Sequence, residues 1–150
     1  MIRRKEIREV EAFPFTESEW AAVGEAALPL VNAALADDTV LREAHLTELL
    51  EVLSGLRHRY GYHPVLLETE ADFTEDEADR VAQYRRAIRI AESHGLPTLS
   101  PRLSFARLLL DVGEPEAARE ELLACKGELD SAEELTQGAW AELEEESRHA

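Results

Sequence analysis

Apolar residues recur at helical intervals along this chain, and turn residues separate the segments in which they do so. From Leu46 to Tyr60 the apolar positions are three, four or seven residues apart, which places them in one stripe along a helix. Glycine, proline or an Asp-Asp pair interrupts such segments about every 10 to 20 residues. The pattern predicts about seven helices joined by short turns, packed as antiparallel neighbours in one all-α domain over residues 1–150.

Residue types at the ends of these segments predict where the helices begin and end. Thr16 and Glu19 have capping-box spacing and should start a helix that runs to about Ala36, with a kink at Pro29. Similar signals should start the later helices at His63-Pro64, Thr74 with Glu77, Ser100-Pro101, Pro115, and Ser131 with Glu134. Single glycines should end them, at Gly61, Gly95, Gly113 and Gly127.

Composition strengthens the helical prediction. The chain has 22 Leu, 22 Ala and 25 Glu, whereas Val and Ile together number only 12. The first three residue types lose little side-chain freedom in a helix, and the β-branched types that suit strands are scarce. We therefore expect no substantial β-sheet.

Small and large apolar residues follow a fixed order around Gly113. Ala106 lies midway along one predicted helix, and Ala118, Leu122 and Cys125 lie on the next, after the glycine turn. Small residues let two helices cross closely, and large ones fill the groove between helix pairs. The order resembles a tetratricopeptide repeat.

The resemblance covers mainly residues 64–126. Tyr84 to Ile90 is similar to the end of a preceding repeat, although Leu122 follows Tyr84 by 38 residues and the family spacing is 34. Arg102 and Arg80 stand where the family has an aromatic and a small residue. The resemblance implies a short solenoid of stacked hairpins: a basic arm over 1–15, a degenerate hairpin over 16–62, repeat-like hairpins over 63–96 and 100–127, and a capping helix over 131–148. The alternative is an unrelated helical bundle.

The resemblance also implies a function. Stacked hairpins form a concave surface lined by their first helices, and such a surface binds another protein or peptide without catalysis or a cofactor. On the helix after Ser100 the outward residues are Ser104, Arg107 and Asp111. We expect these three side chains to contact the partner.

One basic and aromatic cluster stands out in an acidic chain. Arg57, Arg59, Tyr60 and Tyr62 lie within six residues. Arginine forks and tyrosine rings are typical of docking sites for acidic or C-terminal peptides. The alternative is that the cations only complement the dipole at a helix C-terminus.

Catalysis and metal binding have weaker support. His58 and His63 could converge with Glu70 or Asp72, but no HExxH or CxxC motif is present. Cys125 is best interpreted as a small buried residue, not as a nucleophile. We therefore predict no catalytic residue and no metal site.

Charge narrows the class of partner. The formal net charge is −16, which argues against nucleic acid and anionic membranes. The chain has no run of about 18 apolar residues and no apolar segment after its basic start, so we expect a cytoplasmic protein. Residues 111–150 carry 13 acidic and 3 basic side chains, and an acidic inhibitor of a basic partner is the alternative function.

Overall fold

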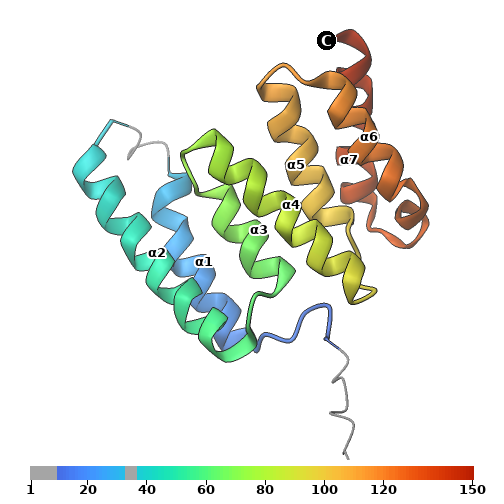
Figure 1. Ribbon diagram of the computed structural model, residues 1–150. Helices are drawn as coiled ribbons and strands as arrows, with labels where there is room; N and C mark the ends of the chain where they lie inside the picture. Colours follow the sequence, from blue (N-terminus) through green and yellow to red (C-terminus); the bar gives the residue numbers. More distant parts are fainter. Residues whose placement is uncertain (1–9, 33–36) are drawn as a thin grey trace, which may run out of the picture.

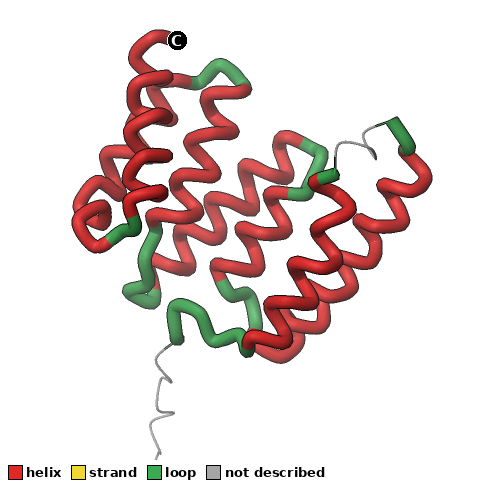
Figure 2. Tube along the Cα trace, turned by 180° about the vertical axis from the view of Figure 1, so that it is seen from behind, coloured by secondary structure: helices red, strands yellow, loops and turns green. Residues whose placement is uncertain are grey.

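A computed structural model describes residues 10–32 and 37–150 of the chain. This part of the chain consists of helices joined by loops and contains no strand (Figure 2). Its helices are α1 (Glu17–Val31), α2 (Thr39–Tyr60), α3 (Pro64–Asp72), α4 (Glu77–Ser93), α5 (Leu99–Asp111), α6 (Pro115–Cys125), the 3-10 helix η2 (Lys126–Ser131) and α7 (Glu134–His149). The predicted all-α fold is confirmed.

Helices that follow one another in the chain pack together. The closest pairs are α1 with α2, α3 with α4, and α5 with α6, and α7 packs on α5 and α6. The second pair meets the third through α4 and α5. The hairpins therefore follow one another across the molecule from α1 to α7, in the order of the sequence (Figure 1).

Several predicted helix ends are confirmed. The Thr16 hydroxyl accepts from the amide of Glu19, and the Glu19 carboxylate accepts from the amide of Thr16, which completes the capping box. Gly95 and Gly113 have φ angles of 66° and 81°. The amides that follow them reach back to the carbonyls of Ala91 and Leu109, as left-handed helix ends require.

The first helix is shorter than predicted. It ends at Val31, where Asn32 has extended dihedral angles, and does not run to Ala36. Pro29 stands in its last turn and has no amide to donate, so this turn lacks a backbone hydrogen bond. Residues 33–36 of the predicted helix lie outside the described residues.

Among the later helices, three predicted starts and one predicted end are wrong. Asp76 and not Thr74 caps α4, because the Thr74 hydroxyl donates to the carbonyl of Glu70 instead. The helix predicted at Ser131 starts at Glu134, and the backbone passes Gly127 in the 3-10 helix without a left-handed turn. The Thr74 hydroxyl therefore bonds elsewhere, and the 3-10 helix continues the chain through Gly127 to Ser131.

The start of α5 shows how a distant residue replaced a predicted cap. The helix begins at Leu99, before Ser100. Glu128, which lies in η2, accepts from the amides of Thr98 and Leu99 at 2.9 and 3.2 Å and from the Thr98 hydroxyl at 2.7 Å. A carboxylate at a helix N-terminus also complements the helix dipole. Contact between α5 and η2 thus sets this helix start.

The small residues around Gly113 lie where two helices touch. Ala106, Ala118 and Cys125 have no exposed surface, and Leu122 is also buried. Burial raises the pKa of the Cys125 thiol to about 11, so the thiol stays protonated at neutral pH. Close contact between α5 and α6 therefore depends on these small side chains.

The arginine that departs from the repeat pattern joins three helices. Arg102 on α5 donates to Glu92 on α4 and to Glu121 on α6. Its side chain is only 13% exposed. Ion pairs of Arg102 therefore join α4, α5 and α6 at the position where the resemblance predicts an aromatic ring.

Two apolar clusters form the core, and α3 contributes to both. Leu66 belongs to the cluster formed mainly by α1 and α2, whereas Ala71 belongs to the cluster formed by α4 to α7. The segment before α1 joins the first cluster through Phe15, whose ring contacts Trp20, Tyr60 and His63. Phe15 is therefore packed against the protein, while residues 1–9 of the predicted arm lie outside the described residues.

None of the helices within residues 10–32 and 37–150 is both long enough and apolar enough to span a lipid bilayer.

Candidate functional site

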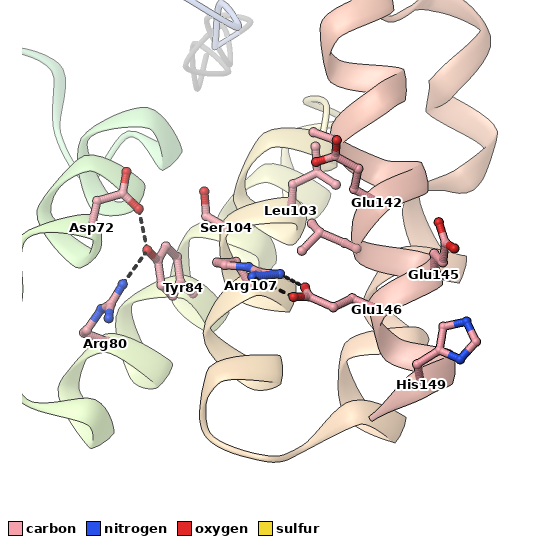
Figure 3. Close-up of a pocket in the computed structure, with 12 residues that line it drawn as sticks. Asp72, Arg80, Tyr84, Leu103, Ser104, Arg107, Glu142, Glu145, Glu146 and His149 are labelled. Atoms are coloured by element: carbon pink, nitrogen blue, oxygen red, sulfur yellow. Dashed lines mark hydrogen bonds and ion pairs between the residues drawn. The ribbon is translucent and has the colours of Figure 1, made fainter.

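An open groove lies between α5 and α7, with α4 and the end of α3 at its side (Figure 3). Its volume is about 800 Å³. Three apolar residues, Leu103, Ala139 and Leu143, line it together with charged and polar side chains. The polar side chains are Asp72, Arg80, Tyr84, Ser104, Arg107, Glu142, Glu145, Glu146 and His149.

Two of the three residues predicted on α5 line this groove. Arg107 points across it and forms ion pairs with Glu146 on α7 and with Asp111 one turn along α5 (Figure 3). Ser104 also lines the groove, where its hydroxyl donates to Glu68 on α3 at 3.0 Å. Asp111 lies outside the groove lining and contributes only through Arg107.

The opposite wall holds a hydrogen-bonded set that joins α3 to α4. The Tyr84 hydroxyl donates to Asp72, and Arg80 donates to the Tyr84 oxygen at 3.4 Å and to the carbonyl of Ala71 at 3.0 Å. Burial raises the pKa of Asp72, and its bond from Tyr84 and the charge of Arg80 offset part of that rise. Burial and the neighbouring Asp72 raise the pKa of Tyr84, so its hydroxyl stays neutral and acts as a donor.

The charges of the groove are only partly paired. Arg107 and Arg80 already have partners within the protein, as does Glu146. Glu142 and Glu145 on α7 form no ion pair with the described residues. The groove therefore offers unpaired negative charge beside apolar surface to anything that enters it.

The cluster predicted at Arg57, Arg59, Tyr60 and Tyr62 divides into two separate contacts, neither of them in the groove. The Tyr60 hydroxyl donates to Glu19 on α1 at 2.5 Å, and Arg59 lies 3.2 Å from the same carboxylate. The pKa of Glu19 is lowered by the bond from the Thr16 amide and then by the bond from Tyr60. Arg59 and Tyr60 therefore join α2 to α1 within the first hairpin.

Tyr62 and Arg57 make the second contact, together with Arg86 on α4. The guanidinium groups of Arg57 and Arg86 lie 5.5 and 4.0 Å from the centre of the Tyr62 ring. Arg57 also pairs with Glu70 at 3.7 Å. The ring is 51% exposed, so this contact leaves one aromatic surface open to solvent.

The described residues do not form the hypothesised centre around His58 and His63. His63 is buried at the start of α3, where Nδ1 accepts from the amide of Val65 and Nε2 lies 2.8 Å from the carbonyl of Glu11. Both ring nitrogens are thus engaged by the backbone, while His58 is exposed on α2. Within the described part of the chain no three His, Cys, Asp or Glu side chains are placed to hold a metal ion.

Sequence reasoning missed the residues that α3, α4 and α7 contribute to the groove. The sequence predicts a capping helix within an acidic segment that could bind a basic partner, but it does not identify Glu142, Glu145 and Glu146 as one wall of a groove. A helical stripe of glutamates was visible in the sequence, but its placement beside Arg107 depends on how α7 packs.

No protein-family model, curated protein or solved structure matches this chain.

Proposed function

We propose that this chain is a cytoplasmic, non-catalytic protein-interaction module, similar in function to tetratricopeptide-repeat adaptors, which binds a segment of a partner protein in the groove between α5 and α7. The observation that carries the proposal is the groove itself. It is open, has a volume of about 800 Å³, and combines apolar residues with side chains from four helices. Such concave surfaces at helix faces are typical sites for peptide segments.

The unpaired charges specify the kind of segment. Glu142 and Glu145 carry negative charge without an internal partner, whereas the arginines of the groove are engaged. Charge complementarity favours a partner segment with basic side chains and guides its approach. Leu103, Ala139 and Leu143 would contact the apolar part of the same segment.

Photo-crosslinking in the native host tests the location of binding. Benzoylphenylalanine replaces Ser104 in the groove or, as a matched control, the exposed Glu120 on α6. We expect one protein to be captured from position 104 and not from position 120. Equal capture from both positions would show that the groove is not the binding surface.

Affinity for the captured protein tests the role of the charges. Glu142→Lys should weaken binding by about tenfold or more, because it replaces an attraction with a repulsion. Glu120→Lys changes the net charge by the same amount on another surface and should leave the affinity within about twofold. Equal affinities of the two variants would contradict the proposal.

A second candidate function, an inhibitor of a basic enzyme, is favoured by the glutamate wall of α7. In that case charge should dominate the association rate, and the rate should fall steeply as salt is raised from low to physiological concentration. A rate that hardly changes with salt would leave the adaptor as the better proposal.

A further inference from the structure

A second pocket adjoins the groove at Asp72, which lines both. It has a volume of about 420 Å³ and lies between the segment before α1 with Trp20, one side of α3, and the start of α5. In Figure 1 that segment passes beneath the lower ends of these helices. The lining is mainly apolar and includes Phe13, Trp20, Pro64, Val65, Pro97 and Pro101.

One carboxylate in this pocket lacks a cation. Glu68 accepts hydrogen bonds from the hydroxyls of Ser100 and Ser104, at 2.7 and 3.0 Å. Both bonds reach the same oxygen, Oε1, so Oε2 has no hydrogen-bond partner among the described residues. No lysine or arginine of those residues pairs with it either.

Two other half-buried carboxylates, on α3 and α6, do have cations. Glu70 pairs with Arg57, and Glu121 pairs with Arg102, while the charge of Arg80 acts on the more exposed Asp72. Burial raises the pKa of Glu68, and the nearby charge of Asp72 raises it further. A cation entering the pocket would therefore relieve an uncompensated negative charge.

The shape and the rim of the pocket decide which cation fits. Glu68 and Asp72 lie four residues apart on α3, so both face the same side of the helix. Trp20 and the exposed Phe13 offer aromatic rings at the same pocket. A flat guanidinium can donate to two carboxylates and stack on an aromatic ring at the same time, which a compact ammonium group does less well.

We propose that this pocket, which we call the Glu68 pocket, binds an arginine side chain of a protein partner. Glu68 Oε2 accepts from the guanidinium, Asp72 adds negative charge that Arg80 offsets only in part, and Trp20 and Phe13 cover the planar group. An apolar side chain in the pocket would instead remove water from the Glu68 carboxylate without replacing its hydrogen bonds, which costs free energy. The proposal rests on the proposed function only for the source of the arginine, since the pocket itself can be tested with a small probe.

The two tryptophans of the chain provide a reporter and an internal control. Trp20 lines the Glu68 pocket, whereas the Trp140 indole donates to the carbonyl of Leu122 in another part of the fold. The ¹⁵N-labelled protein is titrated with N-acetyl-L-arginine N-methylamide and followed by the two indole N–H signals, which Trp140→Phe assigns. We expect the Trp20 signal to move with a Kd on the order of 1 mM, as is typical of so small a ligand. The Trp140 signal should stay in place.

Two comparisons decide whether recognition depends on charge at Glu68. The citrulline analogue has the same shape as the arginine probe without the charge, and it should cause no saturable shift of the Trp20 signal. Glu68→Gln keeps an acceptor for both serine hydroxyls and should weaken binding of the arginine probe by at least about tenfold. Glu120→Gln, on the exposed side of α6, should bind the probe as the natural protein does.

The outcomes separate this inference from the proposed function. Equal shifts with arginine and citrulline, or an unchanged Kd in Glu68→Gln, would overturn the Glu68 pocket even if a partner crosslinks at position 104. A selective Trp20 response would support the pocket even if no protein is captured in the groove, and the proposed function would then fail alone.

Discussion

The first and the third hairpin have the same connectivity but are held together in different ways. In α5 and α6 two small residues, Ala106 and Ala118, have no exposed surface and lie among larger apolar side chains. In α1 and α2 the contact is made by large side chains, among them Val23, Leu49 and Leu53. The buried core of the third hairpin therefore includes small residues that allow close approach, whereas the buried residues described for the first hairpin are all large.

The difference also appears at the surface of the two hairpins. Several large apolar residues of the first hairpin are exposed toward its open end, including Leu28, Val31, Val40 and Leu41. The third hairpin is covered by α7 and linked to α4 through Arg102. The third hairpin therefore has neighbours on both sides, while the first is attached mainly through α3 and the aromatic contacts of Phe15.

The largest effect is expected from Leu49→Ala in the first hairpin. Leu49 is fully buried, so its loss leaves a cavity and should lower the free energy of unfolding by about 3 kcal/mol. Hydrogen exchange should show more lost protection in α1 and α2 than in α5 and α6, because the two clusters are separate. The control is Leu50→Ala, which removes a side chain that is 39% exposed. Equal loss of protection in both hairpins would show that the clusters unfold as one.

A somewhat smaller effect is expected from Ala106→Leu in the third hairpin. There is no room for three more carbons where α5 meets α6, and overpacking should cost about 2 kcal/mol of unfolding free energy, measured by urea denaturation. Ala124→Leu places the same side chain on the exposed face of α6 and should change stability by less than about 0.5 kcal/mol. If the two variants are equally stable, close contact does not hold this hairpin.

Glu128→Ala tests the distant cap that α5 depends on. The variant removes the acceptor of the Thr98 and Leu99 amides and should destabilise the protein by about 1.5 kcal/mol. Asp130→Ala removes an exposed carboxylate from the same 3-10 helix and provides the control. Faster exchange of the two capped amides is the specific readout, and unchanged exchange would contradict the assigned role.

The smallest effect is expected at α3, which joins the two regions. The pKa of Glu68 is raised in the folded state, so the folded protein takes up its proton more readily than the unfolded chain does. Stability is therefore lost as pH rises through that pKa, and the charged group is a cost at pH 7. Glu68→Gln should raise the melting temperature at pH 7 by about 2 °C. The difference in melting temperature between Glu68→Gln and the natural protein should shrink as the pH falls below the folded pKa of Glu68. A lower melting temperature of Glu68→Gln at pH 7 would contradict this assignment.

Sequence reasoning located only residues that α5 contributes to the candidate site. Helical periodicity put Ser104 and Arg107 on the outward face of α5, and both line the groove. Arg59 and Tyr60 were predicted to meet a partner but contact Glu19, 40 and 41 residues away. Contacts over such distances depend on how hairpins pack, which local spacing does not contain.

The helix ends show the same division between local bonds and contacts over long sequence distances. The capping box at Thr16 and the glycines at 95 and 113 acted as predicted, because each involves bonds within a few residues. The predicted caps at Ser100 and Ser131 did not form, since Glu128 caps α5 and the 3-10 helix delays α7. The Ser100 hydroxyl instead donates to Glu68, which belongs to the pocket.

By itself the sequence determined the helical class, the number of helices, and the small residues at the contact between α5 and α6, because helix propensity and periodicity act over one or two turns. Only the tertiary structure decided that Glu146 of α7 pairs with Arg107 and that Glu68 is half-buried without a cation. The reason is that burial and charge pairing depend on groups that are distant in the chain and meet only when the hairpins pack.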